Sequence, residues 1–285
     1  MMHIAPVYGF EFTRPFSAAG LSFTPSETNS SSAKRIARDL SAHHMTGTIA
    51  ANAIDRETIY ELEGVLSFIE HLDVMVLEPI SGHQAEPDPT KAFEPTLIAR
   101  RRHNGGGAVI GSDAFNPCKN SRQQFIELCL THLKDKSFCD QTRFRSLLFK
   151  SVETFRQRQP FLEITYFLLI SGLEAFCRAC QGDYTSRNAA IPITNQLKLY
   201  GFNVFQDNPG ELSRSISTYL HIRNALFHQG DFTSTVNINH GLVQFNCSQH
   251  LFNLSMLCSL TVMKAIGFDD GHTNWDCWID RELHR

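Results

Sequence analysis

Residues 161–180 read FLEITYFLLISGLEAFCRAC, and this stretch decides the fold class of the C-terminal half of the chain. Apolar side chains would lie on nearly all sides of a helix over this stretch, whereas a surface helix carries them on one face only. Glu163 and Glu174 interrupt the run, which favours a buried globular helix over a membrane span. We therefore expect this helix to lie at the centre of a helical bundle.

Helical periodicity continues on both sides of this central stretch. Two segments before it carry apolar stripes at helical spacing. After it come a long helix that ends near Gly230 and a last, apolar helix. The expected helical segments are 125–133, 147–155, 161–180, 211–228 and 245–266. The sequence thus predicts an all-α bundle of four or five helices within residues 119–285.

Residues 1–118 carry mixed signals and are predicted to form a separate α+β module. Alternating apolar and polar residues indicate short strands, and Asp55 is a plausible N-cap for a helix that runs to Ile69. A Ser/Thr/Asn-rich loop is expected at 26–32. The expected strands are 9–13, 44–49 and 74–77, with a hairpin over 96–110 that turns at 104–107.

The composition of the 285 residues indicates an ordinary globular protein. Hydrophobic residues make up 42% and charged residues 19%, and the net charge of −3 argues against a protein that coats DNA. The first residues lack the basic and apolar runs of a signal peptide, and eight cysteines without such a signal predict reduced thiols. We expect a cytoplasmic protein that contacts no membrane.

The polar residues of the 211–228 helix gather on one stripe. Its members at helical spacing are Ser217, His221, Asn224 and His228. Arg214 extends the stripe by one turn, and the long side chain of Arg223 can lean onto it. The opposite face, which must meet the core, carries Ile216, Leu220 and Phe227. The competing interpretation is a solvated polar face on an amphipathic helix.

The string Arg223-Asn224-Ala225-Leu226-Phe227-His228 resembles the signature of HEPN domains (higher eukaryotes and prokaryotes nucleotide-binding). In that signature an arginine, often followed directly by a polar residue, is separated from a histidine by four to six residues, and here four residues lie between them. The upstream residues 167–176, FLLISGLEAF, resemble the central helix of the ApeA-like and abortive-infection branch of the family. The resemblance covers about residues 121–268, and we name no family for residues 1–118.

The resemblance implies a metal-independent endoribonuclease without a cofactor, active as a homodimer through the helical domain. Cleaving RNA in this way needs a base, an acid and positive charge at the phosphate. His228 would transfer protons, Arg223 would bind the phosphate, and Asn224 would orient either side chain. One copy carries one motif histidine, so two copies would supply both the acid and the base.

Other polar residues of the helical domain are candidates for supporting roles. Glu174 either holds Arg223 or forms a local pair with Arg178 one helical turn later. His221 supports the motif, and Arg214 and Arg178 are expected to contact RNA. Ten Lys/Arg against six Asp/Glu give residues 141–228 a net charge of +4, the sign that a phosphate ligand requires, although charges also segregate by chance.

Four further motifs are better explained without a function. Arg100–His103 is a basic run that suits a solvated hairpin tip more than an RNA contact. Asn104–Gly107 lacks the Lys-Ser/Thr of a P-loop. Cys177 and Cys180 lie inside an apolar helix with no second CxxC, so we expect buried thiols and no metal site. His43-His44 occupies opposite faces of a strand and suits no single ion.

Three interpretations of the chain follow. The first is an RNA-cleaving enzyme in phage defence or stress response, a toxin whose N-terminal module senses a trigger or restrains the nuclease. A regulatory partner such as an antitoxin is compatible with it. The second is a non-catalytic helical module that binds RNA, a nucleotide or a protein partner. The third is a polar helix face of purely structural meaning. Retention of both Arg223 and His228 favours the first.

Overall fold

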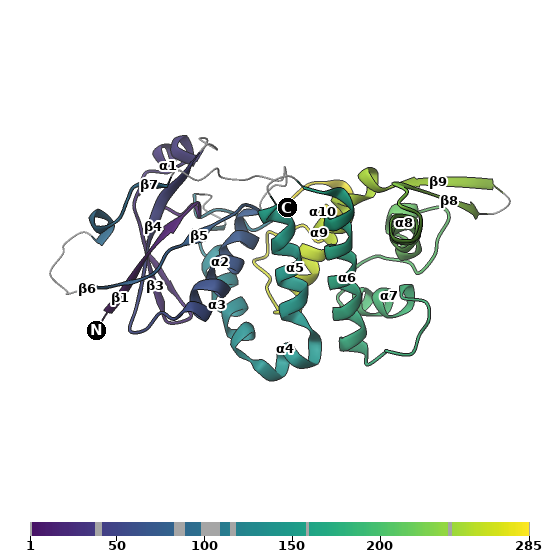
Figure 1. Ribbon diagram of the computed structural model, residues 1–285, viewed down its shortest axis with the longest axis horizontal. Coiled ribbons are helices and arrows are strands. Elements are labelled where there is room, and N and C mark those ends of the chain that lie inside the picture. Colours follow the sequence, from purple (N-terminus) through teal and green to yellow (C-terminus); the bar gives the residue numbers. More distant parts are fainter. Residues whose placement is uncertain are drawn as a thin grey trace. The chain divides into compact units, whose positions relative to one another are not determined.

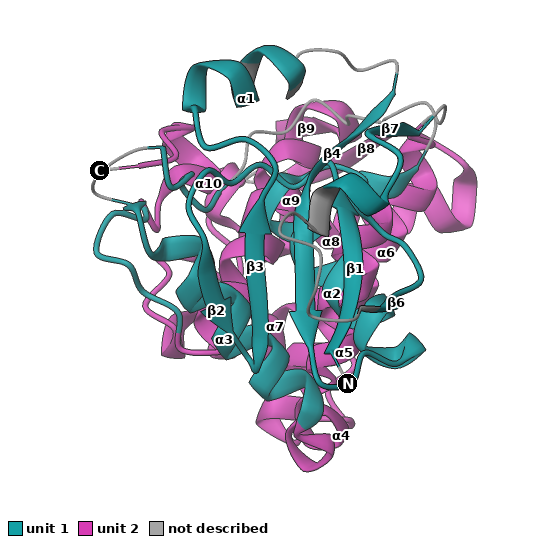
Figure 2. Cartoon of the chain, turned by 90° about the vertical axis from the view of Figure 1, so that its left-hand side faces the viewer, with its two compact units in different colours: residues 1–134, 155–158, 268–273 teal, residues 135–154, 159–267, 274–285 magenta. Residues whose placement is uncertain are grey.

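The computed structural model describes residues 2–37, 42–82, 89–97, 109–114, 118–157, 160–238 and 241–284. Two compact units divide the chain: unit 1 is 1–134, 155–158 and 268–273, and unit 2 is 135–154, 159–267 and 274–285 (Figure 2). An antiparallel sheet region precedes a helical region, so a mixed chain with an N-terminal α+β part is confirmed. The helix at Ser121–Lys134 belongs to unit 1 in this division, whereas we had placed the boundary before it, at 118/119.

Unit 1 is built on an antiparallel sheet in the order β2-β3-β4-β1-β5, with β6 paired to β1 and β7 to β4 (Figure 2). Its described strands are β1 Met2–Tyr8, β2 Phe16–Ala18, β3 Leu21–Pro25, β4 His43–Ala51, β5 Met75–Val76, β6 Ile80–Gly82 and β7 Thr96–Leu97. In β3, Leu21 and Phe23 are buried while Ser22 and Thr24 are exposed. This alternation is typical of an antiparallel strand with one face on the core.

The helices of unit 1 are α1 (Ser30–Ala37), α2 (Arg56–Glu70) and α3 (Ser121–Lys134). The predicted N-cap of α2 is confirmed, since the Asp55 carboxylate accepts a hydrogen bond from Thr58 N at 2.8 Å. Aromatic rings fill the core between α2 and α3, where Phe68 stacks on Phe125 at a centroid distance of 5.2 Å. The high phenylalanine content therefore serves packing in this unit.

Three expectations for unit 1 were wrong in detail. The strand expected at 9–13 is irregular, because Gly9 ends β1 with φ of 90° and the buried Phe10 and Phe12 alternate without a partner strand. The loop expected at 26–32 gives way to α1 at Ser30, since Asn29 Oδ1 accepts from the first amides of the helix.

The hairpin expected at 96–110 is the third expectation for unit 1 that differs from the structure. Thr96–Leu97 pairs with β4 instead, and Val109 and Ile110 are buried in a bend. The Arg100–His103 run and the glycine turn at 104–107 lie outside the described residues. The predicted strands at 44–49 and 74–77 correspond to β4 and to the shorter β5.

Gly47 of β4 is a position where a side chain has no room. A Cβ there would lie 2.5 Å from the backbone oxygen of Thr24 and would also overlap the ring of Phe12, which is buried. We expect Gly47→Ala to lower the free energy of unfolding by about 1–3 kcal/mol, because strand backbone cannot yield as a side chain can. Urea titration of the two proteins measures this difference.

Gly172 of the central helix is the matched control. A Cβ at Gly172 would meet Lys150 Cδ at 3.4 Å, an ordinary contact, within a helix where alanine is favoured over glycine by about 0.5–1 kcal/mol. Gly172→Ala should therefore be neutral or stabilising. Equal destabilisation by both substitutions would contradict the steric explanation.

Unit 2 is a helical unit with one added hairpin. Its described elements are α4 Lys136–Thr142, most of α5 Phe144–Arg156, α6 Leu162–Gln181, α7 Ala190–Leu199, η3 Leu212–Arg214, α8 Ile216–Gln229, β8 Thr233–Ile238, β9 Gly241–Asn246, α9 Cys247–Ala265 and α10 Cys277–Asp280 (Figure 1). Helix α6 packs against α4, α7, α8 and α9. The prediction that residues 161–180 form the central helix is confirmed.

The β8–β9 hairpin was not foreseen. We had expected a helix from Phe245, but β9 runs to Asn246 and α9 begins at Cys247, where Asn246 Oδ1 accepts from Ser248 N at 2.9 Å. Helix α8 is also shorter than the 211–228 expected, because a 3-10 turn at Leu212–Arg214 precedes it. Among the described residues, no helix has the length and apolarity to cross a membrane.

Candidate functional site

Helix α8 carries the Arg-x4-His motif, and both of its ends are fixed locally. At the start, the buried Ser215 hydroxyl donates to Asn208 O at 2.9 Å and accepts from Asn208 N at 2.8 Å. At the end, Gly230 adopts φ of 73°, and its amide donates to Leu226 O. This left-handed cap suits glycine and ends the helix two residues after His228. The motif therefore occupies the last two turns of a helix with a defined end.

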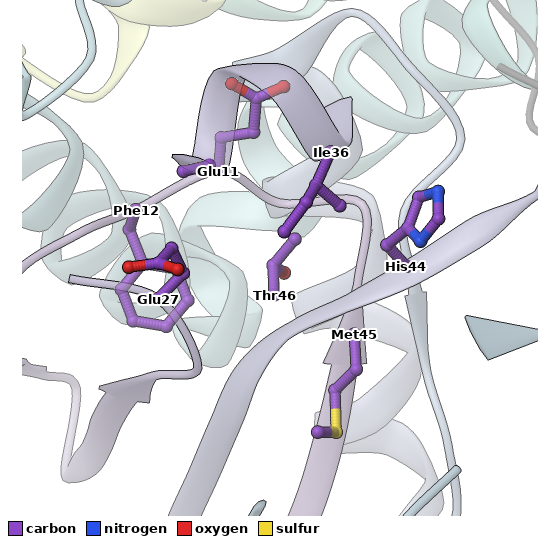
Figure 3. Close-up of a pocket in the computed structure, with 8 residues that line it drawn as sticks. Glu11, Phe12, Glu27, Ile36, His44, Met45 and Thr46 are labelled. Carbon is purple, nitrogen blue, oxygen red and sulfur yellow. The ribbon is translucent and has the colours of Figure 1, made fainter. Parts of the chain in front are cut away.

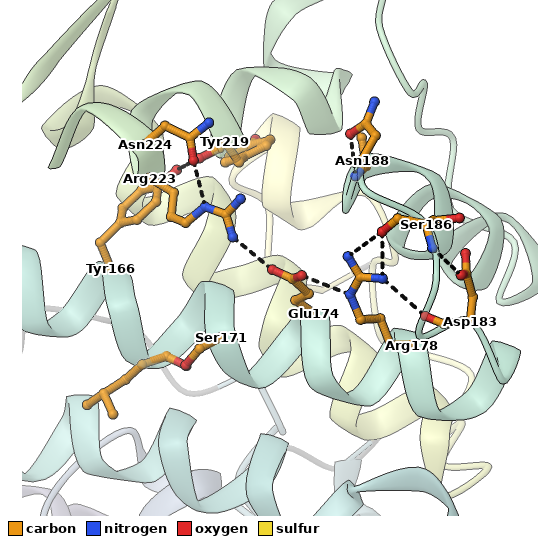
Figure 4. Close-up of polar contacts among 12 residues, drawn as sticks. Tyr166, Ser171, Glu174, Arg178, Asp183, Ser186, Asn188, Tyr219, Arg223 and Asn224 are labelled. Carbon is orange, nitrogen blue, oxygen red and sulfur yellow. Dashed lines mark hydrogen bonds and ion pairs between the residues drawn. The ribbon is translucent and has the colours of Figure 1, made fainter. Parts of the chain in front are cut away.

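Glu174 of α6 contacts two arginines, Arg178 of the same helix and Arg223 of α8 (Figure 4). Its Oε2 accepts from Arg223 Nη1 at 2.9 Å, and its Oε1 accepts from Arg178 Nε at 2.9 Å. Both interpretations of Glu174 that the sequence left open are thus present together. The side chains of Arg223 and Glu174 are 28% and 21% exposed, so this pair is accessible from solvent.

Arg223 also contacts its neighbour in the motif. Its Nε donates to Asn224 Oδ1 at 3.0 Å, so two fixed acceptors hold the guanidinium while part of it stays open (Figure 4). Asn224 therefore orients Arg223 as expected. A guanidinium held in this way is set in place for a ligand oxygen before the ligand arrives, which lowers the cost of ordering it on binding.

His228 and His221 lie on the accessible side of α8, with His228 exposed and His221 half-buried against the ring of Phe245 at a centroid distance of 6.2 Å. Helix geometry places His228 about 7.5 Å along the axis from Arg223 and about 140° round it. Arg223 leans toward α6 rather than fully onto the expected stripe. A ligand that touches both groups has to pass over Asn224, which lies between them.

Two arginines that we expected to contact RNA are bound internally. Arg178 donates to Glu174, to Asp183 O at 3.1 Å and to Ser186 O at 3.1 Å, so it ties the loop after α6 to the helix. Arg214 donates to Asn203 O at 3.0 Å and lies beside Asp276 and over the ring of Trp278. Their guanidinium groups serve the fold, and we do not carry them into the proposal below.

A buried tyrosine fixes α6 against α8. The Tyr166 hydroxyl donates to Tyr219 O at 2.9 Å in the interior of unit 2. Burial raises the pKa of Tyr166 well above its usual value, so the hydroxyl remains a donor. This contact sets the distance at which Glu174 meets Arg223. The sequence carries no signal for it, because the two tyrosines are far apart along the chain.

Phe227 corrects the expectation that it faces the core. It is 43% exposed, and its ring meets Phe167 of α6, itself 45% exposed, at a centroid distance of 5.1 Å with the planes at 75°. Ile216 and Leu220 are buried as expected. The side of α8 that carries Arg223 and Phe227 meets α6 at its accessible edge, which explains why both residues stay partly open.

The thiols of unit 2 behave as packed side chains. Burial raises the pKa of Cys180 to about 11 and that of Cys177 well above its usual value, so neither favours a thiolate. None of the eight cysteines, all of which the structure describes, forms a disulfide. Within the part of the chain that the structure describes, no group of three or more His, Cys, Asp or Glu side chains is arranged to hold a metal ion.

Unit 1 contains a small pocket that is open to solvent (Figure 3). Its lining residues are Glu11, Phe12, Glu27, Ala33, Ile36, His44, Met45 and Thr46. His44 lines this pocket, whereas the neighbouring His43 is buried and lies 4.0 Å from the carboxylate of Asp73. No residue pattern in the sequence indicates this pocket.

Comparison with protein-family models, with curated proteins and with solved structures gives no match for this chain. The structure brings together Arg223, Asn224, Glu174 and Arg178, keeps His228 and His221 accessible nearby, and engages Arg214 elsewhere in unit 2.

Proposed function

We propose that unit 2 is a metal-independent endoribonuclease of HEPN type. One observation carries the proposal: Arg223 is held by Glu174 and Asn224 with part of its guanidinium open to solvent, five residues before the exposed His228 on the same helix. A fixed cation for a phosphate and an accessible imidazole for proton transfer are two of the groups that RNA cleavage without a metal requires.

The proposed reaction is an internal transfer of the phosphoryl group. A base removes the proton of a ribose 2′-hydroxyl, the 2′-oxygen forms a bond to phosphorus, and the bond from phosphorus to the 5′-oxygen breaks. An acid gives a proton to the leaving 5′-oxygen. The products are a 2′,3′-cyclic phosphate and a 5′-hydroxyl, and no water is consumed. Arg223 stabilises the charge that gathers on the phosphate oxygens in the transition state.

Two copies of the motif are needed for this chemistry. Within one chain, the other histidine of α8 is His221, which lies two turns from His228, about 10.5 Å along the axis. One phosphodiester is too short for both to act on it. A two-fold pair of α8 helices supplies one histidine as the base and its mate as the acid. We therefore propose a homodimer formed through the helical unit.

The proposed cellular setting is phage defence or stress response. An RNA-cleaving unit that needs no cofactor must be restrained until it is required, and unit 1 is then the part that senses a trigger or a regulatory partner. The competing function is a non-catalytic helical module that binds RNA, a nucleotide or a protein. The pairing of Arg223 with Glu174 suits that function too, because it partly neutralises the guanidinium.

The direct test is RNA cleavage in the presence of excess EDTA. We expect the purified protein to degrade RNA at an unchanged rate when divalent metals are removed, because no step is assigned to a metal. The products should carry 2′,3′-cyclic phosphates, which acid opening and mass spectrometry identify. Complete dependence on Mg²⁺, or products with 5′-phosphates, would contradict the mechanism. Binding of RNA without any cleavage would favour the non-catalytic function.

A further inference from the structure

Two exposed aromatic side chains form a pair at the edge of the candidate site. Phe167 of α6 and Phe227 of α8 are 45% and 43% exposed, and their ring centroids lie 5.1 Å apart in an edge-to-face arrangement. Single exposed apolar residues are common on protein surfaces and need no explanation. Two neighbouring phenylalanines from different helices, both nearly half open, make an aromatic surface that the core does not use.

A lysine of α5 and an arginine of α8 lie beside the helix faces that carry the two rings. On α6, Phe167, Ser171 and Glu174 follow at helical spacing, and Lys150 Nζ donates to Ser171 Oγ at 3.0 Å. On α8, Phe227 follows Arg223 by one turn, about 6 Å along the axis. Glu163 lies one turn before Phe167 and is the acidic group at the far end. The surface thus runs from two aromatic rings to a lysine and an arginine.

Aromatic rings beside cations are the means by which proteins hold single-stranded nucleic acid, because every base has a face to stack and every linkage has a charge. Resting on the function proposed above, we propose that Phe167 and Phe227 form a stacking platform for one unpaired base of a single-stranded RNA. The phosphate next to that base then lies at Arg223, and the neighbouring His228 reaches the linkage that is cleaved.

The charges favour RNA over a second copy of the chain as the occupant of this surface. A protein interface over the two rings would also cover Lys150 and the open part of the Arg223 guanidinium, whose ion-pair partner Glu174 is shared with Arg178. Burying these cations without further acceptors is costly. A phosphate backbone supplies partners for both. Base-paired RNA keeps its bases stacked inside the helix, so the platform selects unpaired RNA.

The test measures binding separately from cleavage. The probe is a fluorescein-labelled oligouridylate in which every ribose is 2′-O-methylated, so that it lacks the hydroxyl that cleavage needs. We expect wild-type protein to bind this strand more tightly than the same strand in a duplex. Phe167→Leu and Phe227→Leu should each weaken binding roughly 5- to 100-fold, because leucine keeps the apolar volume and the helix but removes the stacking face.

Tyr60→Leu is the matched control, because Tyr60 of α2 is 44% exposed and the same aromatic face is lost in unit 1. Phe227→Trp keeps an aromatic face at this position and should bind the strand about as tightly as wild type. This variant also changes the packing, so tight binding would assign the loss in Phe227→Leu to stacking. A 2-aminopurine base placed in the strand should lose fluorescence on binding wild type and keep it with Phe227→Leu.

Other outcomes would contradict the proposal that Phe167 and Phe227 stack on a base. Unchanged affinity in both leucine variants contradicts it, as does a wild-type protein that does not bind the methylated strand. A change from dimer to monomer in light scattering, with no change in affinity per protomer, would assign the two rings to an interface between copies. If the binding pattern holds and unmethylated RNA is never cleaved, the platform stands and the proposed ribonuclease activity fails.

Discussion

Replacing His228 by alanine should abolish RNA cleavage while leaving the protein folded. A general acid or base contributes about 10²- to 10⁴-fold to a rate, and in a two-fold pair the substitution removes both groups at once. His228 is exposed in the last turn of α8, so its loss should change the free energy of unfolding by less than about 0.5 kcal/mol. Initial rates on a labelled RNA and a urea titration measure the two quantities.

The control for this substitution is His284→Ala, which removes another exposed imidazole near the C-terminus. It should cleave RNA at the wild-type rate. Mixing the wild-type protein with an excess of His228→Ala adds a sharper test. A mixed pair keeps one of the two histidines, so the activity per wild-type chain should fall if the site is shared between copies. Cleavage by His228→Ala at the wild-type rate would contradict the assignment of His228 as the group that transfers protons.

Replacing Arg223 by alanine should lower the cleavage rate by about 10²- to 10³-fold, because the transition state loses its fixed cation. The fold should persist for a local reason. Glu174 keeps its 2.9 Å contact with Arg178 when Arg223 is absent, so no carboxylate is left without a partner. Single-turnover rates at saturating RNA separate this loss from weaker binding.

Two further variants complete this experiment. Arg223→Lys keeps the charge but not the planar fork, so it should recover only part of the rate. Arg187→Ala removes an exposed arginine from the same unit and should leave the rate unchanged. A loss of solubility or stability in Arg223→Ala, with the rate unaltered, would show that the polar face of α8 has only a structural role.

Local chemistry made several elements predictable. Helix α2 begins where Asp55 can cap it, α8 ends where Gly230 can adopt a left-handed conformation, and α6 is central because its residues are apolar on most sides. The failures share a cause as well. The strand expected at 9–13 and the helix expected from Phe245 were drawn from the pattern of apolar residues alone, and that pattern does not show which segments find a partner strand.

The sequence by itself determined which groups can do chemistry in this protein: the Arg-x4-His spacing, the adjacent amide of Asn224 and a glutamate on an otherwise apolar helix. Only the tertiary structure decided which partners these side chains contact and which of them stay exposed. It joined Glu174 to two arginines at once, engaged Arg178 and Arg214 in the fold, and left Phe227 open beside Phe167. Spacing along a helix fixes the direction in which a side chain leaves the axis, whereas its partner and exposure depend on which distant helix packs there.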